Sequence, residues 1–182
     1  MLCPAGDITA HFGRLDHNNP SPVTMNQGKQ KFRDKLQWEP WSDDLAIGIA
    51  SIDDDHRQIL RLIGTLYDAV GCPDPQAAIS DTMATLTQYV EHHFRREETL
   101  LELARFSALE AHRSVHDTFR DYVRLQAQDD SPQNATQLLS YLINWWVGHI
   151  ATDDKFYREQ VLLHPDAIAI AEAIPPMPCR QQ

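Results

Sequence analysis

Four successive stretches of this chain each carry metal-binding side chains on an otherwise apolar face. Five of these side chains are histidines and two are carboxylates: His56, His93, Glu97, His112, His116, His149 and Asp154. Two of the pairs are spaced i, i+4, which on an α-helix places both side chains on one face, about one turn apart. Polar groups are costly to bury unless they are paired or coordinated, so this pattern strongly limits how the chain can fold.

The apolar residues around these positions have helical spacing. Between residues 53 and 70, Ile59, Ile63 and Leu66 recur at steps of three and four, and His56 continues their stripe. The other three stretches have stripes of the same kind: Leu86, Val90, His93, Glu97 and Leu101; Leu109, His112, His116, Phe119 and Val123; and Leu138, Leu142, Trp145 and His149.

Breaks separate the stretches at residues 71–75, 106–107 and 129–134, and Asp53 is the expected N-cap of the first helix. Long helices joined by short turns predict an all-α fold, an antiparallel up-down-up-down four-helix bundle.

The types of ligand limit the metal. Imidazole nitrogens and carboxylate oxygens, with no cysteine among them, suit iron, zinc or manganese. Seven ligands are too many for one tetrahedral ion but suit two six-coordinate ions that share carboxylates. A single buried histidine, or one isolated i, i+4 pair, occurs often by chance. Because all four helices carry such groups on their apolar stripes, the sequence predicts a dinuclear metal site in the core of the bundle.

Composition excludes several other classes of protein. The 182 residues include 16 Lys and Arg against 26 Asp and Glu, a formal charge of −10. This acidity argues against nucleic acid or an anionic membrane as the main partner. We expect no membrane span, because no run approaches the roughly 18 apolar residues of a spanning helix. The N-terminus lacks the apolar core of a secretory signal, and the three cysteines are far apart, so we expect a cytoplasmic protein.

Periodicity also divides the chain. Residues 1–37 are polar and without sustained periodicity, which predicts a flexible N-terminal extension. Residues 38–160 contain the lead-in and the bundle. Residues 161–182 are expected to be a C-terminal tail, in which the sequence DAIAIAEAI can form a short helix before a proline-rich end.

These residues resemble those of the bacterial hemerythrins, a family of non-haem di-iron proteins that bind dioxygen. The resemblance covers about residues 38–160, and the matching stretches are Trp41, IGI at 47–49, IDDDH at 52–56, HFRREE at 93–98, HRSVH at 112–116 and NWWVGHIATDDKFY at 144–157. It implies two iron ions, with all five histidines as terminal ligands and Glu97 and Asp154 as bridging carboxylates. Leu101 stands where the family commonly has Met, a difference that affects packing and leaves the ligand set intact.

The resemblance also implies how the ligands are shared. One iron takes His112, His116 and His149. The other takes His56 and His93 and keeps an open position for dioxygen. We expect Ile59, Phe94 and Trp145 to form an apolar wall near that position, which would slow autoxidation.

Helix geometry and the family pattern differ at the last ligand. Asp153 lies four residues after His149 and is the better aligned on a regular helix, whereas the family pattern selects Asp154 at the fifth position. We select Asp154, because a local π-type bulge or a tilted side chain would reconcile the two. Asp153, Glu98 and His92 are expected to be solvated surface residues, as is the acidic run at 53–55.

A histidine-rich ligand set favours reversible binding over oxidation of a substrate, because di-iron oxygenases and ferritins use mainly glutamate ligands. We therefore expect a protein for oxygen storage, delivery to oxygen-requiring enzymes or sensing, and not an enzyme. One alternative is a di-iron protein that handles nitric oxide or peroxide, or that repairs iron centres. The other is an interaction module, in which residues 1–37 or 161–182 report the state of the metal to a partner.

Overall fold

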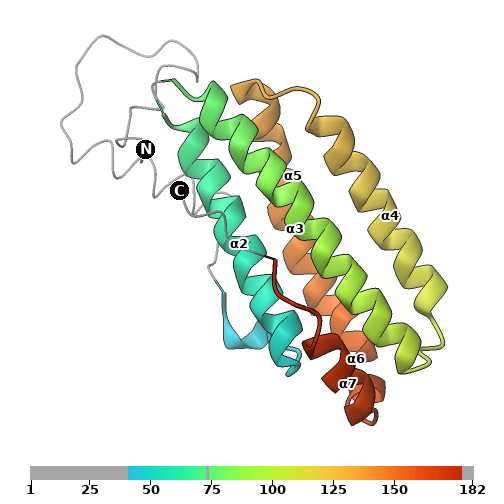
Figure 1. Cartoon of the computed structure of the whole chain (residues 1–182). Coiled ribbons are helices and arrows are strands. Elements are labelled where there is room, and N and C mark those ends of the chain that lie inside the picture. Colours follow the sequence, from blue (N-terminus) through green and yellow to red (C-terminus); the bar gives the residue numbers. More distant parts are fainter. Residues whose placement is uncertain (1–40, 73, 178–182) are drawn as a thin grey trace.

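The computed structural model describes residues 41–72 and 74–177, and all regular secondary structure in these residues is helical. The four long helices are α2 (Ala50–Val70), α3 (Gln76–Leu103), α4 (Leu109–Gln126) and α5 (Pro132–His149). Figure 1 shows them side by side, with successive helices running in opposite directions. The predicted all-α, up-down-up-down bundle is confirmed, as are the three predicted breaks. The expected flexible extension, residues 1–37, lies outside the described residues.

The last long helix changes its pitch before it ends. After α5 the chain passes through the π-helical turn η3 (Ile150–Asp154) into α6 (Lys155–Val161). A further helix, α7 (Pro165–Glu172), then packs on α3 and α2 and confirms the expected short C-terminal helix. None of the helices in the described ranges is long and apolar enough to cross a membrane.

The start of α2 differs from the prediction. Asp53 is not the N-cap, because the helix begins at Ala50 after Ile49, preceded by the short 3-10 turn η2 (Asp43–Leu45). The Asp53 carboxylate instead accepts hydrogen bonds from the backbone N–H groups of Ile47 (2.8 Å) and Gly48 (3.0 Å). Gly48 has a φ of +82°, which turns the lead-in chain back over the helix and exposes these donors to the carboxylate.

Two other helix ends have recognisable chemistry. Ser131 caps α5 by accepting a hydrogen bond from the N–H of Asn134 at 3.2 Å. At the end of α3, Arg105 has a φ of 52°, and the N–H of Phe106 donates to the carbonyl of Leu101 at 2.9 Å. This is the Schellman arrangement, formed here without the usual glycine. It turns the chain sharply into α4, so that α3 and α4 lie antiparallel.

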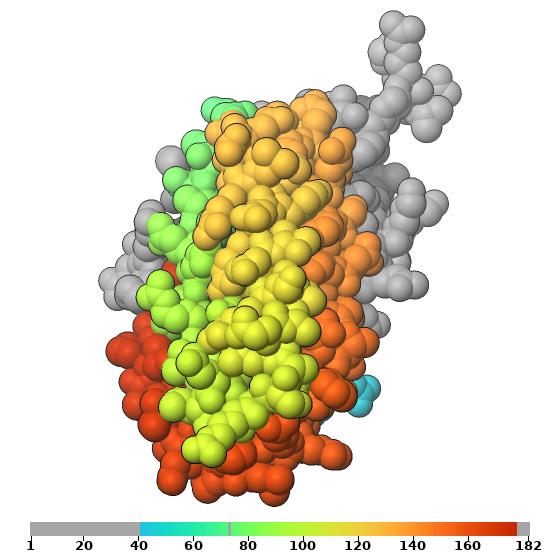
Figure 2. All heavy atoms as spheres, turned by 90° about the vertical axis from the view of Figure 1, so that its right-hand side faces the viewer, coloured from blue at the N-terminus to red at the C-terminus, as the bar shows by residue number. Residues whose placement is uncertain are grey.

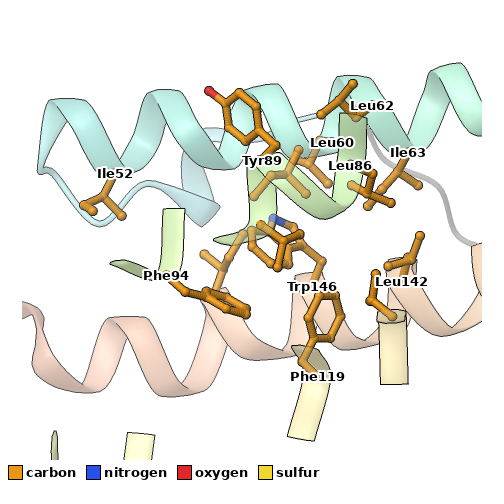
Figure 3. Close-up of a cluster of buried hydrophobic side chains, with 14 of the residues drawn as sticks. Ile52, Leu60, Leu62, Ile63, Leu86, Tyr89, Phe94, Phe119, Leu142 and Trp146 are labelled. Atoms are coloured by element: carbon orange, nitrogen blue, oxygen red, sulfur yellow. The ribbon is translucent and has the colours of Figure 1, made fainter. Parts of the chain in front are cut away.

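The apolar core runs along the axis of the bundle. Figure 3 shows Phe94, Phe119 and Trp146 pointing into the space between the helices, with Ile63, Leu86 and Leu142 at the other end of the cluster. Figure 2 shows the face on which α4 fills the space between α3 and α5. The phase of these stripes decides which polar side chains also point inward.

Candidate metal centre

The seven predicted metal-binding side chains meet inside one end of the bundle. In an antiparallel bundle, the beginnings of α2 and α4 lie at the same end as the ends of α3 and α5, and each helix brings its polar groups to that end. All seven side chains are buried, with exposed fractions between 0% and 6%: His56, His93, Glu97, His112, His116, His149 and Asp154.

Glu97 lies between histidines of α3 and α4. Its Oε2 is 3.2 Å from Nε2 of His116 and 3.5 Å from Nε2 of His93. Its Oε1 is 3.6 Å from Nε2 of His112. Glu97, His112, His116 and His149 each offer a ligand atom within 4.8 Å of the others, a spacing that suits a metal ion.

Asp154 lies opposite and connects a second set of histidines. Its Oδ2 is 3.2 Å from Nε2 of His56, and its Oδ1 is 3.1 Å from Nε2 of His149 and 3.8 Å from Nε2 of His112. The two carboxylates therefore both reach from the α2–α3 side of the site to the α4–α5 side. Such a position allows each of them to touch two ions.

The π-helical turn brings Asp154 into the site. In η3 the N–H of Lys155 bonds to the carbonyl of Ile150, five residues earlier, so positions five apart share a face. Asp154 is fully buried, whereas the side chain of Asp153 is 45% exposed. The predicted π-type bulge is confirmed.

The unpaired atoms test whether a metal fits. Among the described residues, these buried atoms have no hydrogen-bond partner: Nδ1 and Nε2 of His56 and of His93, both carboxylate oxygens of Glu97 and of Asp154, and Nε2 of His112. Buried polar atoms without hydrogen bonds cost free energy. Bound cations would satisfy the Nε2 atoms and the carboxylate oxygens, which face one another across the site. The nitrogen and oxygen donor set fits iron.

Charge within the site is balanced by protons in the metal-free protein. Burial raises the pKa of Glu97, but the neighbouring imidazoles of His112, His116 and His93 outweigh this effect and hold the pKa well below its usual range. Burial lowers the pKa of His149, but the carboxylate of Asp154 outweighs this and raises it to about 9. Burial lowers the pKa of His93. Binding of a metal must therefore displace a proton from His149.

Three carboxylates face the outer nitrogens of these histidines, and two of them are within hydrogen-bonding distance. Nδ1 of His116 bonds to Oε1 of Glu98 at 2.8 Å, and Nδ1 of His149 bonds to Oδ2 of Asp153 at 3.0 Å. Asp153 is 45% exposed, as expected of a surface residue, whereas Glu98 is only 17% exposed. The contacts of both carboxylates with histidines were not expected from the sequence. A residue next to a ligand lies about 100° around its helix, and there it can meet the neighbouring helix or its own preceding turn.

The third carboxylate, Asp55, lies 3.6 Å from Nδ1 of His93 through its Oδ2. The expectation of a solvated acidic run at 53–55 is wrong, because Asp53 and Asp55 are only 6% and 2% exposed. Such outer contacts fix the orientation of metal-binding imidazoles. His92 is also not simply a surface residue, since its Nε2 bonds to the carbonyl of Pro175 at 2.8 Å.

Aromatic rings enclose the site, and one of them differs from the prediction. The indole of Trp146 lies 5.8 Å from the ring of His56 and 5.3 Å from that of His93, between ring centroids. Trp145, the residue we expected there, stacks instead on His149 at 4.3 Å. Trp146 is fully buried, as are the expected wall residues Ile59 and Phe94.

Tyr157 is a residue of the site that sequence reasoning missed. It is fully buried, its ring lies 5.7 Å from that of His112, and its hydroxyl has no hydrogen-bond partner among the described residues. Burial raises the pKa of this hydroxyl well above its usual value, and the charges of Glu97 and Asp154 raise it further. Its spacing, three residues after Asp154, is the feature of the sequence that could have identified it.

Comparison with known proteins identifies a cation-binding family over the residues that form the bundle and the site. Residues 47–160 match the family described as the hemerythrin HHE cation binding domain. The chain is 37% identical over 126 residues to a bacteriohemerythrin of Pseudomonas aeruginosa, covering 66% of this chain and 80% of the relative. It is 34% identical over 134 residues to one of Stenotrophomonas maltophilia (71% and 85%), and 23% identical over 118 residues to a myohemerythrin of Theromyzon tessulatum (65% and 89%).

Proposed function

The chain belongs to the hemerythrin family, whose domains bind a di-iron centre, and on that premise we propose that it binds dioxygen reversibly. The observation that carries the proposal is the pair of buried carboxylates, Glu97 and Asp154, each within 3.6 Å of histidines from both sides of the site. Its role is storage of oxygen, delivery to oxygen-requiring enzymes, or sensing. The cytoplasm is its proposed location.

The proposed ligands follow this geometry. Glu97 and Asp154 would be shared between the two ions. The histidines from α4 and α5, which are His112, His116 and His149, would hold one iron, and His56 and His93, from α2 and α3, would hold the other. Since the second iron would have one protein ligand fewer, we propose that it is the one that binds a small molecule.

Iron, when bound, would supply the redox chemistry for dioxygen binding. The role of the surrounding residues would be to keep water and protons away from it. Trp146 lies against His56 and His93, and the ring centroid of Phe94 is 5.5 Å from that of His93, so the space beside these two histidines is bounded by rings. An apolar enclosure of this kind slows irreversible oxidation of a metal site. We therefore propose a carrier, store or sensor rather than an enzyme.

The test is reconstitution with iron under anaerobic conditions. We expect about two irons per chain, a visible absorption band on exposure to air, and loss of that band on degassing. Azide should compete with dioxygen. One iron per chain, or zinc held in preference to iron, would contradict the dinuclear site. Consumption of dioxygen with no reversible spectrum would instead support nitric oxide or peroxide chemistry, or repair of iron centres.

A further inference from the structure

Arg96 is a buried cation that joins two distant parts of the chain. Its side chain is 3% exposed. Nη1 donates to Oδ2 of Asp55 at 2.6 Å, and Nη2 donates to the backbone carbonyl of Ile174 at 2.8 Å. Nη1 also donates to the carbonyl of Ser51 at 3.4 Å. A buried guanidinium is costly unless it is paired, and these contacts together keep Arg96 in place. It thereby connects α2 with the segment that follows α7.

Asp55 carries this connection to the metal site. It is 2% exposed, and its Oδ1 accepts a hydrogen bond from the hydroxyl of Tyr89 at 3.2 Å. Its Oδ2, which Arg96 holds, is also the atom 3.6 Å from Nδ1 of His93. Movement of Arg96 would therefore free the carboxylate that faces the outer nitrogen of His93.

The segment 165–177 packs on α2 and α3 near Arg96 and Asp55, and among the described residues its hydrogen bonds to α3 come from two side chains. It runs from α7 back along α2 and α3 at the end of the bundle that holds the site (Figure 1). Ala167 and Ala171 are its buried residues. Its polar anchors on α3 are Arg96, at the carbonyl of Ile174, and His92, at the carbonyl of Pro175. Loss of one polar anchor should therefore loosen the segment measurably.

His93 differs in this respect from His116 and His149. Their outer carboxylates, Glu98 and Asp153, have side chains that are 17% and 45% exposed, and the segment 165–177 is not among their hydrogen-bond partners in the described structure. The support of His93 is buried and shared with that segment. Docking of the segment can therefore act on the iron with the open position and spare the other iron.

We propose that Arg96 is a positioning residue that couples docking of residues 165–177 to the orientation of His93 through Asp55. The C-terminal segment thereby regulates iron retention and dioxygen binding at the ion held by His56 and His93. This inference rests on the proposed function, because it takes His93 as a ligand. Outer carboxylates of this kind change metal affinity by about 10- to 100-fold when they are removed.

The test compares full-length variants loaded anaerobically with iron. Arg96→Gln should speed loss of one iron to a chelator by about 10-fold and speed amide hydrogen exchange in residues 165–177. Arg95→Gln, at the exposed neighbouring position, should change neither. Arg96→Lys should hold the contact with Asp55 but not both contacts at once, so iron loss should stay nearer to that of the unaltered protein while exchange of the segment still rises.

A second pair of variants loosens the segment from its own side. Ala171→Asp places a charge at a fully buried position of α7, and Ala169→Asp places it at an exposed one. We expect Ala171→Asp alone to speed loss of one iron. Combined with Arg96→Gln, it should add little further, since both changes break one coupled contact. This pair also provides the test if Arg96→Gln fails to fold.

The outcomes separate this proposal from the one on which it rests. If the unaltered protein does not hold two irons or bind azide, the proposed function fails. If it does, and Arg96→Gln and Ala171→Asp both lose iron at the unaltered rate, the function stands and the coupling is wrong. Additive effects of the two changes would also overturn the coupling. A shift of the azide absorption band in Arg96→Gln, with no shift in Arg95→Gln, would support the coupling, because a purely structural role of Arg96 would leave that band unchanged.

Discussion

The two ends of the bundle bury their residues equally well and for opposite reasons. At one end, Leu66 of α2 and Leu86 of α3 are fully buried among other apolar side chains. At the other end, about three turns away on the same helices, His56 and Glu97 are just as buried. Burial of the leucines contributes roughly 25 cal/mol for each Å² removed from water, whereas burial of the polar groups costs free energy unless they are paired or coordinated.

The difference indicates that one end of the helices stabilises the fold and the other end binds metal. The apolar end supplies stability that is present without metal. The polar end depends on protons, or on metal, to satisfy its atoms. Changes at the two ends should therefore separate stability from metal binding.

The largest expected effect is loss of iron from Glu97→Ala. Glu97 lies within 3.6 Å of three histidines, and its removal leaves the two ions without one of their proposed bridges. We expect this variant to lose its two-iron complement. Glu98→Ala should weaken iron binding by about 10-fold, because Glu98 supports His116 only from outside. Metal analysis and the azide spectrum give the comparison. Equal iron content in the two variants would show that Glu97 does not point into the site in preference to Glu98.

Next in size is the effect of Leu86→Ala at the apolar end. A fully buried leucine cut back to alanine costs about 2–5 kcal/mol of unfolding free energy. We expect this loss in the metal-free protein, together with an unchanged count of two irons per chain. Urea denaturation and metal analysis measure the two quantities. Gln88→Ala, at an exposed position of the same helix, is the matched control. A loss of iron in Leu86→Ala would show that the two ends are coupled.

A smaller effect is expected from pH. Because the pKa of His149 is raised from 6.5 to about 9, its stabilising contribution is fully present below pH 6.5 and is lost as pH rises through about 9. Glu97 and Asp154 have lowered pKa values, so their contribution is present above about pH 4.5 and is lost on acidification. The metal-free protein should therefore be less stable at pH 9.5 than at pH 6, by on the order of 1–3 kcal/mol.

Urea denaturation at the two pH values checks this, and His149→Gln is the variant that should remove the dependence. Iron displaces the proton of His149, so the iron-loaded protein should lose the same dependence. Leu86→Ala should keep it. A metal-free His149→Gln protein that retained the full loss of stability between pH 6 and 9.5 would assign the effect to another group.

The smallest expected effect is that of Tyr157→Phe. The change removes a buried hydroxyl that lacks a hydrogen-bond partner in the described structure. We expect the unfolding free energy of the metal-free protein to change by less than about 1 kcal/mol, because no hydrogen bond is lost. Thermal or urea unfolding measures it. A loss of several kcal/mol would show that the hydroxyl is bonded, with Glu97 as the nearest candidate acceptor.

Neighbours of the ligands show where sequence reasoning failed. It placed Trp145 where Trp146 lies, and it missed the contacts of Glu98, Asp153 and Asp55 with histidines. One residue along a helix is a rotation of about 100°, so a stripe drawn through i+3 and i+4 positions can select the wrong member of an adjacent pair. Periodicity also predicts that a residue turned away from the apolar stripe is solvated, because the pattern contains no information about a neighbouring helix.

The family resemblance, and not periodicity, selected Asp154 over Asp153. The periodicity of the sequence determined the all-α bundle, its three turns and the other six buried polar positions. These features follow from local repetition of apolar and polar side chains, which is legible without knowledge of neighbours. Tertiary structure decided the rest. The π-helical turn η3 resets the phase that brings Asp154 inward, and the folding back of residues 165–177 pairs Arg96 with Ile174. Both depend on contacts between segments far apart in the chain. A local pattern of side chains contains no information about the energy of such contacts.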